Sequence, residues 1–303
     1  MLPPLIHLGA NKTGSTSLQR LLFRRHPRLV YFGEEGPRDQ GPRARAFLHE
    51  DEEYADVAGF LQLVRAKARV ASRTRKRLVF SSEDYCSSPV LGQATARLYR
   101  AFPRATIVLV VREPVSALTS WYTNHGAFLK GVPYRYWRKF VRPEEWCRHL
   151  LQFPRYGPLE FFRYERFVRI LLRHYPASSL RVLVYEESLR QPEKYASHWA
   201  EALGIPAQDI SRVLAAPRIR VSNNRWQLLF HQLASRLPVS FRRAMQGDDI
   251  SGETGWKWLA CLPGSPVRLP AVYRRQFHEY YRASNRYLEK TLGLNLKAYG
   301  YGE

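Results

Sequence analysis

Small and hydroxyl-bearing residues near the start of the chain have the composition of an anion-binding turn. The apolar run Leu5 to Leu8 predicts a buried strand, and Leu18 with Leu22 predicts one face of a helix. Between them lie two glycines and four hydroxyl side chains: Gly9, Gly14, Thr13, Ser15, Thr16 and Ser17. Glycine lets a ligand approach the backbone closely, and a helix start adds unpaired N–H groups and a positive dipole end. We therefore expect a strand-to-helix turn that binds a phosphate or a similar anion.

The spacing of this turn is close to that of a nucleoside-triphosphate loop, G-x-x-x-x-G-K-[ST], but differs at one residue. In that loop the lysine follows the second glycine and reaches the terminal phosphates. Here Ser15 takes that place, and Lys12 comes two residues before Gly14. We expect Lys12 to lie across the mouth of the turn, beside the bond being broken. A helix start with surplus capping hydroxyls would have a similar composition.

A second junction of strand and helix places an arginine and a serine at a useful separation. The seven apolar or β-favouring residues before Arg112 predict a strand, and Pro114 suits the first turn of a helix. Ser120 then lies about two helical turns beyond Arg112. An arginine fork and a hydroxyl at this separation can hold one phosphate. In a simpler interpretation Arg112 pairs with Glu113 or Glu83, and Ser120 only packs.

The elements that must position these residues alternate between strands and helices. Strands are predicted at 4–8, 28–32, 77–82, 105–111 and 180–185. Helices are predicted near 15–25, 54–72, 90–101, 115–130, 192–203 and 269–292, with further helical segments across 143–175. This order implies crossover connections, so we expect an α/β protein with a P-loop-like fold, in which helices flank a central parallel β-sheet of about five strands. Gly204 and Gly293 should cap two helices, and residues 33–45 and 247–270 should be surface loops that border the site.

Composition favours a single globular domain over 1–303. Of the 303 residues, 45% are hydrophobic and 13% aromatic, so the chain can bury a large core. No apolar run approaches the roughly 18 residues of a membrane span, and the first is too short for a secretory signal, so we expect a cytoplasmic protein. Cys86, Cys147 and Cys261 are odd in number and widely separated, which indicates neither disulfides nor a zinc site.

The net charge of +22 predicts attraction to anions. The partner would be a polyanionic ligand or an anionic membrane surface, the latter bound peripherally at the inner membrane face. A genomic bias toward arginine codons would give the same excess of charge, and runs such as residues 73–77 also fit a solvated helix end. Nucleic acid is not expected as a partner, because the sequence has no recognised nucleic-acid-binding module.

The two motifs together resemble those of sulfotransferases that use 3′-phosphoadenosine 5′-phosphosulfate. Residues 12–17 resemble the family's 5′-phosphosulfate loop, and 112–114 with Ser120 resemble its 3′-phosphate motif at the right spacing. The segment 180–205 is similar to the strand and helix that close the family's sheet, and the tail 284–301 is similar to that of bacterial carbohydrate-type members. The resemblance spans nearly the whole chain, but only the first two motifs are specific.

The resemblance implies a role for each site residue. Donor-binding residues would be Lys12, Thr13, Gly14, Ser15, Thr16 and Ser17 at the 5′ end, with Arg112 and Ser120 at the 3′-phosphate. Glu83 follows a predicted strand at the same sheet edge as Arg112, so it is assigned as general base, with His125 in reserve. A salt bridge to Arg112 or Lys12 is the alternative role of Glu83. Lys12 would stabilise the bridging oxygen as the sulfur–oxygen bond opens, and no metal is expected.

The acceptor implied by the resemblance is a hydroxyl of a carbohydrate or glycolipid, with phenols and lipids as alternatives, and the nucleotide product is 3′-phosphoadenosine 5′-phosphate. One rival function is a P-loop kinase or nucleotide hydrolase with Glu83 or Asp84 on magnesium, which Ser15 in the place of lysine argues against. Another is a non-catalytic polyanion-binding module. A further polar group either approaches the nucleotide or an acidic glycan, or lies only at the surface: Arg218, Arg220, Asn223, Asn224 and Arg225.

Overall fold

The computed structural model describes residues 2–10, 12–33, 40–128, 139–217, 223–238, 240–241, 259, 262 and 266–302. Contacts between residues divide the chain into two compact units. The first comprises Met1–Glu113, Phe161–Arg220 and Tyr281–Glu303, and the second comprises Pro114–Glu160 and Val221–Tyr280. The expectation of a single domain over 1–303 stays a prediction.

The first unit is built on a parallel sheet of five strands, which confirms the predicted fold class. The strands are β1 (Leu5–Gly9), β2 (Leu29–Gly33), β3 (Arg77–Ser82), β4 (Thr106–Val111) and β5 (Leu180–Val184), in the order β2-β3-β1-β4-β5. Each predicted strand matches an observed one to within one residue at either end. Leu8 pairs with Ser82 and Gly9 with Val110, so β1, β3 and β4 end at the same level. The strand order reverses around β1, and open α/β sheets bind ligands at such a switch point.

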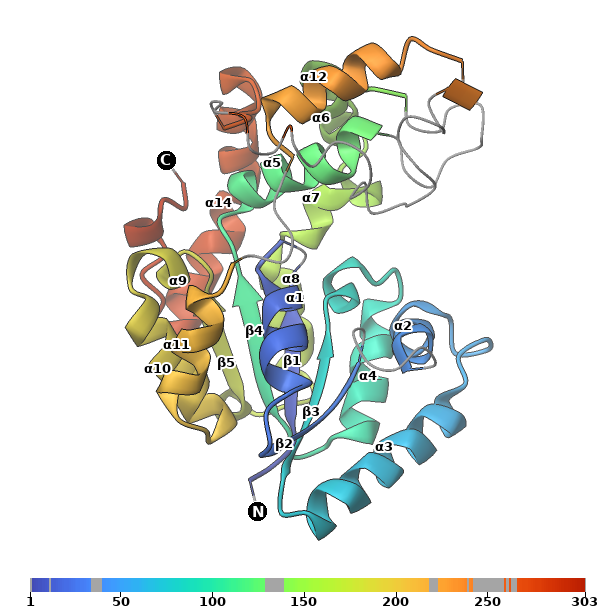
Figure 1. The fold of residues 1–303 in the computed structure, drawn as a ribbon, viewed down its shortest axis with the longest axis vertical. Coiled ribbons are helices and arrows are strands. Elements are labelled where there is room, and N and C mark those ends of the chain that lie inside the picture. The colour runs from blue at the N-terminus through green and yellow to red at the C-terminus, as the bar shows by residue number, and fades with distance from the viewer. Residues whose placement is uncertain are drawn as a thin grey trace. The chain divides into compact units, whose positions relative to one another are not determined.

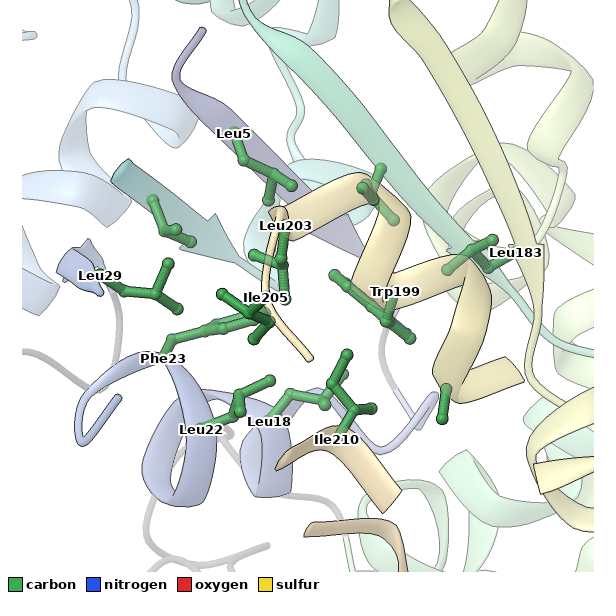
Figure 2. Close-up of a cluster of buried hydrophobic side chains, with 14 of the residues drawn as sticks. Leu5, Leu18, Leu22, Phe23, Leu29, Leu183, Trp199, Leu203, Ile205 and Ile210 are labelled. Carbon is green, nitrogen blue, oxygen red and sulfur yellow. The ribbon is translucent and has the colours of Figure 1, made fainter. Parts of the chain in front are cut away.

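One face of the sheet is covered by η1 (Leu18–Phe23), α10 (Pro192–Leu203) and α11 (Ala207–Ala215). Figure 2 shows Phe23, Trp199 and Ile210 of these segments packed with Leu5 and Leu183 of the strands. Complete burial of such a side chain contributes about 1.5–3 kcal/mol. The helix predicted at 15–25 is three residues of α-helix, α1 (Ser15–Ser17), followed by the π-helical turns of η1. The cluster therefore anchors the segment that follows the predicted anion-binding turn. Figure 1 labels the start of this segment as α1.

The opposite face is covered by α2 (Gln40–His49), α3 (Val57–Arg73) and α4 (Leu91–Ala101), which bury a set of phenylalanines. The rings of Phe32 and Phe80 lie 5.0 Å apart, and Phe47 stacks on Phe60 at 3.6 Å between centroids. The prediction of a surface loop over 33–45 is wrong from Gln40 onward, because Phe47 draws this segment into a helix against the core. Gly33 ends β2, and 34–39 lie outside the described residues.

The first unit also contains η2 (Asp84–Ser87), α8 (Tyr164–Leu171), η6 (Ala177–Ser179), α9 (Glu187–Arg190) and η8 (Lys297–Tyr299). Of these, η2 and α9 follow the carboxyl ends of β3 and β5, whereas η6 leads into β5. The long helix α14 (Ala271–Leu292) contributes residues to both units. Gly204 and Gly293 have φ values of 70° and 66°, so both predicted caps are in the left-handed conformation that favours glycine.

The second unit contains α5 (Pro114–Asn124), η3 (Gly126–Phe128), α6 (Pro143–Gln152), η5 (Pro154–Tyr156), α7 (Pro158–Phe161) and α12 (Arg225–Ala234). Asn224 begins α12 with a capping box: its side chain accepts from the backbone amide of Gln227, and the Gln227 side chain accepts from the backbone amide of Asn224. Asn223 donates to the Thr123 carbonyl at 2.8 Å. These two asparagines therefore support the local fold, whereas Arg218, Arg220 and most of 247–270 lie outside the described residues. Within the described ranges, no helix combines the length and the apolar character that crossing a bilayer requires.

Candidate functional site

The turn between β1 and α1 has a backbone shaped by three residues. A methyl group on Gly9 would collide with the side chain of Ser15 and lie 3.3 Å from His7 Nε2. Gly14 precedes α1 with φ at 79°, and Lys12 also has a positive φ of 72°. A residue other than glycine is costly there, by roughly 1–2 kcal/mol. The turn thus holds Lys12 in an unusual conformation two residues before the exposed Gly14.

The hydroxyl groups of the turn have different uses. Thr13 Oγ1 donates to the Ala10 carbonyl at 2.6 Å and lies 3.0 Å from Ser15 Oγ, and both side chains are buried. These two residues hold the turn closed. Thr16 points toward the neighbouring strand end, and the half-buried Ser17 closes the first helical turn by donating its amide to the Gly14 carbonyl.

Glu83 lies directly after β3, and the structure connects it to the turn. Thr16 Oγ1 donates to Glu83 Oε1 at 3.2 Å. On either side, the Asp84 amide donates to Ser82 Oγ at 3.1 Å, and His49 Nε2 lies 2.9 Å from the Asp84 carbonyl oxygen. Asp84 itself begins η2 and faces Arg45 at 3.9 Å. The structure thus has a carboxylate after β3 beside the turn, and the role of Glu83 as general base stays a prediction.

Arg112 lies directly after β4 and is joined to the turn from the other side. Its Nη1 donates to the Lys12 carbonyl at 2.7 Å, and its amide donates to the buried Tyr164 hydroxyl at 3.1 Å. Its guanidinium carbon lies 5.0 Å from the centre of the Tyr185 ring, a cation–π distance. A methyl on Gly14 would lie 3.4 Å from the same ring. Tyr185 is a site residue that the sequence reasoning missed, although its position directly after β5 was a signal.

A polar group lies buried under the turn, and it was also missed. Gln19 Nε2 donates to Ser81 Oγ at 2.9 Å, and Ser81 Oγ lies 2.8 Å from His7 Nδ1. Burial lowers the pKa of His7 to about 3, so the ring is neutral at pH 7. Because Gln19 donates to Ser81, the Ser81 hydroxyl can donate to Nδ1. The signal in the sequence was His7, a histidine within the otherwise apolar strand β1.

Behind Arg112 lies a second carboxylate, Glu186. Its Oε1 accepts from the Glu113 amide at 2.9 Å, and its Oε2 accepts from the Tyr301 hydroxyl at 3.4 Å. Burial raises the pKa of Glu186, while the Glu113 amide and the positive charge of Arg112 act in the opposite direction. Sequence patterns gave no sign that the last residues of the chain reach this place.

Ser120 and His125 belong to the second unit. Ser120 is buried on α5, and its carbonyl accepts from Asn124 Nδ2 at 2.8 Å. The His125 ring stacks on Trp121, with centroids 4.6 Å apart. The phosphate clamp of Arg112 with Ser120, and the reserve role of His125, therefore stay predictions.

An open parallel sheet with a glycine-bearing turn at its switch point, and with polar side chains after three strands, defines an α/β protein with a P-loop-like fold. A model of the sulfotransferase family matches residues 3–209, so the chain belongs to the sulfotransferase family and is a transferase. No curated protein matches the chain.

Solved structures of sulfotransferases match the chain, and the first of those described here is similar to it in fold. The enzyme from Alicyclobacillus acidocaldarius has 17% identity and a TM-score of 0.52, with 98% of each chain covered. Mouse sulfotransferase SULT7A1, solved in complex with PAP, has 15% identity and a TM-score of 0.45, covering 99% of this chain and 89% of that one. The sulfotransferase domain of an olefin synthase from Synechococcus PCC 7002 has 17% identity and a TM-score of 0.41, covering 93% and 94%.

Proposed function

We propose that the protein transfers a sulfuryl group from 3′-phosphoadenosine 5′-phosphosulfate to a hydroxyl of a carbohydrate or glycolipid. The observation that carries the proposal is the hydrogen bond from Arg112 Nη1 to the Lys12 carbonyl at 2.7 Å. The resemblance assigns these residues to opposite ends of one nucleotide, although 100 positions separate them in the chain. A common donor site requires that both residues lie within reach of one nucleotide, and this hydrogen bond brings them together.

The residues present fit the donor. A nucleotide with an anionic group at each end needs an open backbone for one end and a cation for the other. Gly14 leaves the backbone exposed before the positive end of α1, and Arg112 is held at its site by Tyr185. Lys12, Thr13, Gly14, Ser15, Thr16 and Ser17 would bind the 5′ end, and Arg112 with Ser120 would bind the 3′-phosphate. When bound, the donor supplies an activated sulfuryl group.

The chain's own residues then have two tasks. Glu83 removes the proton from the acceptor hydroxyl, and the hydrogen bond from Thr16 orients its carboxylate. A general base in this position contributes about 10²–10⁴ in rate. Lys12 places a positive charge where negative charge develops on the bridging oxygen. No step in this scheme requires a metal.

A membrane partner has support from the second unit. On α12 the side chains of Leu229 and Leu233 lie one turn apart and are 45% and 53% exposed. Within that unit, the stretch 221–247, which includes α12, contains four arginines and no acidic residue. Apolar side chains among basic ones suit the interface of an anionic bilayer. We therefore place the protein in the cytoplasm, with peripheral binding at the inner membrane face and access to a glycolipid acceptor.

Thermal denaturation with nucleotides tests the donor assignment against its rivals. A ligand that binds the folded state at 100 times its dissociation constant stabilises it by about 2.7 kcal/mol. Saturating 3′-phosphoadenosine 5′-phosphate should therefore raise the melting temperature without magnesium, and Arg112→Ala should abolish most of the rise. Stabilisation by ATP with magnesium alone would indicate a kinase or hydrolase. Stabilisation by heparin but by neither nucleotide would indicate a polyanion-binding module.

The acceptor is tested separately. Mass spectrometry of glycans and lipids from cells with and without the protein should show species heavier by one sulfuryl group only when the protein is present. Sulfated phenols in place of sulfated saccharides would overturn the carbohydrate assignment and leave the donor assignment intact.

A further inference from the structure

The C-terminal tail turns inward after η8 and buries its last tyrosine. The amides of Tyr299 and Tyr301 both donate to the Leu296 carbonyl, at 2.9 and 3.3 Å. Gly300 between them has φ at 88°, which allows the chain to reverse. As a result the Tyr301 side chain is only 4% exposed, and Leu296 is fully buried. This end of the chain is thus docked on the first unit.

The two tyrosines of the tail contact neighbouring glutamates that serve different networks. Tyr301 donates to Glu186, whose other oxygen accepts from the amide of Glu113, the residue after Arg112. Tyr299 donates to Glu187 at 3.3 Å. Glu187 also pairs with Lys194 and His198 on α10, at 2.8 and 3.0 Å. Only Tyr301 leads to the predicted phosphate-binding arginine.

Glu186 is placed to control Arg112 by charge as well as by geometry. Glu186 holds the Glu113 amide, and although burial raises the pKa of this carboxyl, the positive charge of Arg112 favours its ionised form. Burial raises the pKa of Tyr301 well above its ordinary value, so the phenol keeps its proton and remains a donor to Glu186. With both of its oxygens accepting hydrogen bonds, the carboxylate is fixed. A carboxylate released from one of them can turn toward the guanidinium and compete with a phosphate for it.

We propose that the C-terminal tail is part of the nucleotide site, and that Tyr301 is a positioning residue which acts through Glu186 to keep Arg112 available to the 3′-phosphate. The inference rests on the proposed function. It extends the site to the last residues of the chain, more than 180 positions from Arg112.

The test compares two nucleotides that differ only in the 3′-phosphate. Dissociation constants for 3′-phosphoadenosine 5′-phosphate and adenosine 5′-phosphate are measured by calorimetry for the wild type, Tyr301→Phe, Tyr299→Phe and Arg112→Ala. Tyr301→Phe should weaken binding of the bisphosphate about three- to tenfold and leave binding of the monophosphate unchanged. Tyr299→Phe removes a hydroxyl from the same tail and should affect neither. Arg112→Ala should remove most of the preference for the bisphosphate.

Each other outcome has a definite meaning. If the wild type has no preference for the bisphosphate, the proposed function fails. A second outcome is that the wild type and Tyr301→Phe both prefer the bisphosphate, whereas Arg112→Ala does not. In that case the role of Tyr301 is refuted, and the proposed function stands. Equal weakening of both nucleotides by Tyr301→Phe would indicate a general loss of structure and would also refute the role.

Discussion

In the proposed mechanism Glu83 must accept the proton of the acceptor hydroxyl. Glu83→Gln keeps an oxygen that can accept from Thr16 but cannot remove a proton. Turnover should therefore fall by about 10²–10⁴, while the dissociation constant of 3′-phosphoadenosine 5′-phosphate changes less than twofold. Steady-state kinetics and calorimetry measure the two quantities. Asp84→Asn, which changes the adjacent carboxylate, is the control and should retain turnover. Wild-type turnover in Glu83→Gln would remove Glu83 from the mechanism.

The buried His7 makes stability depend on pH. Its pKa of about 3 in the folded protein lies below the 6.5 of an unfolded chain, so the unfolded state binds more protons between these values. The stabilisation is complete above pH 6.5 and falls as the pH drops toward 3, by about 1.4 kcal/mol per pH unit. Urea unfolding at pH 7, 6 and 5 should show this slope in the wild type.

His7→Asn should reduce the slope, because the amide does not titrate and can still accept from Ser81. His149→Asn, at an exposed position, controls for the loss of one histidine. Equal slopes in the wild type and His7→Asn would contradict the assignment of a neutral buried ring.

At the scale of elements, the turn after β1 depends on the absence of a side chain at Gly9. Gly9→Ala would drive a methyl into Ser15, so we expect a loss of several degrees in melting temperature together with loss of nucleotide binding. Gly92→Ala is the matched control, because the added methyl on α4 would meet nothing within 4 Å besides its chain neighbours and the backbone of its own helix. Alanine is favoured over glycine in helices by about 0.8–1 kcal/mol, so this variant should be at least as stable as the wild type. Unchanged nucleotide binding by Gly9→Ala would show that the turn is not the binding element.

The elements that the sequence predicted well are those whose pattern is local. Each strand is a short apolar run bounded by polar residues, and the parallel sheet follows from its alternation with helices. Helix α2 could not be predicted, because Phe47 makes it a helix through contact with Phe60, which lies on a different element. Tertiary packing outweighs local propensity in such segments.

For the whole molecule, the charge of +22 and the apolar side of α12 predict binding to anionic membranes. The protein should sediment with phosphatidylglycerol vesicles but not with phosphatidylcholine vesicles, and raising the salt from 0.1 to 0.5 M should release it. The double variant Leu229→Ser/Leu233→Ser should lose several-fold in bound fraction. Leu189→Ser, at an equally exposed leucine of α9, should not. Sedimentation of both variants like the wild type would show that α12 is not the binding surface.

Part of the candidate site could be predicted because, like the strands, it is encoded in local sequence patterns. Motif spacing and strand ends led to Lys12, Arg112 and Glu83 as candidates, since each follows its own strand closely, and their roles stay predictions. Tyr185 and Tyr301 come to the site through the register of β5 and the docking of the tail, and neither is encoded in a short motif. The left-handed backbone of Lys12 was likewise beyond sequence reasoning, because it is imposed by the turn as a whole.

The left-handed backbone of Lys12 implies a trade-off between thermal stability and turnover at this position. A glycine at position 12 would relieve a strain of roughly 1–2 kcal/mol, and would at the same time delete the ammonium group. Directed evolution for thermal resistance alone should therefore enrich glycine or asparagine at this codon, whereas selection for product formation should retain lysine. If the same substitution raises stability in one screen and lowers activity in the other, Lys12 is retained for its chemistry although it lowers the stability of the fold.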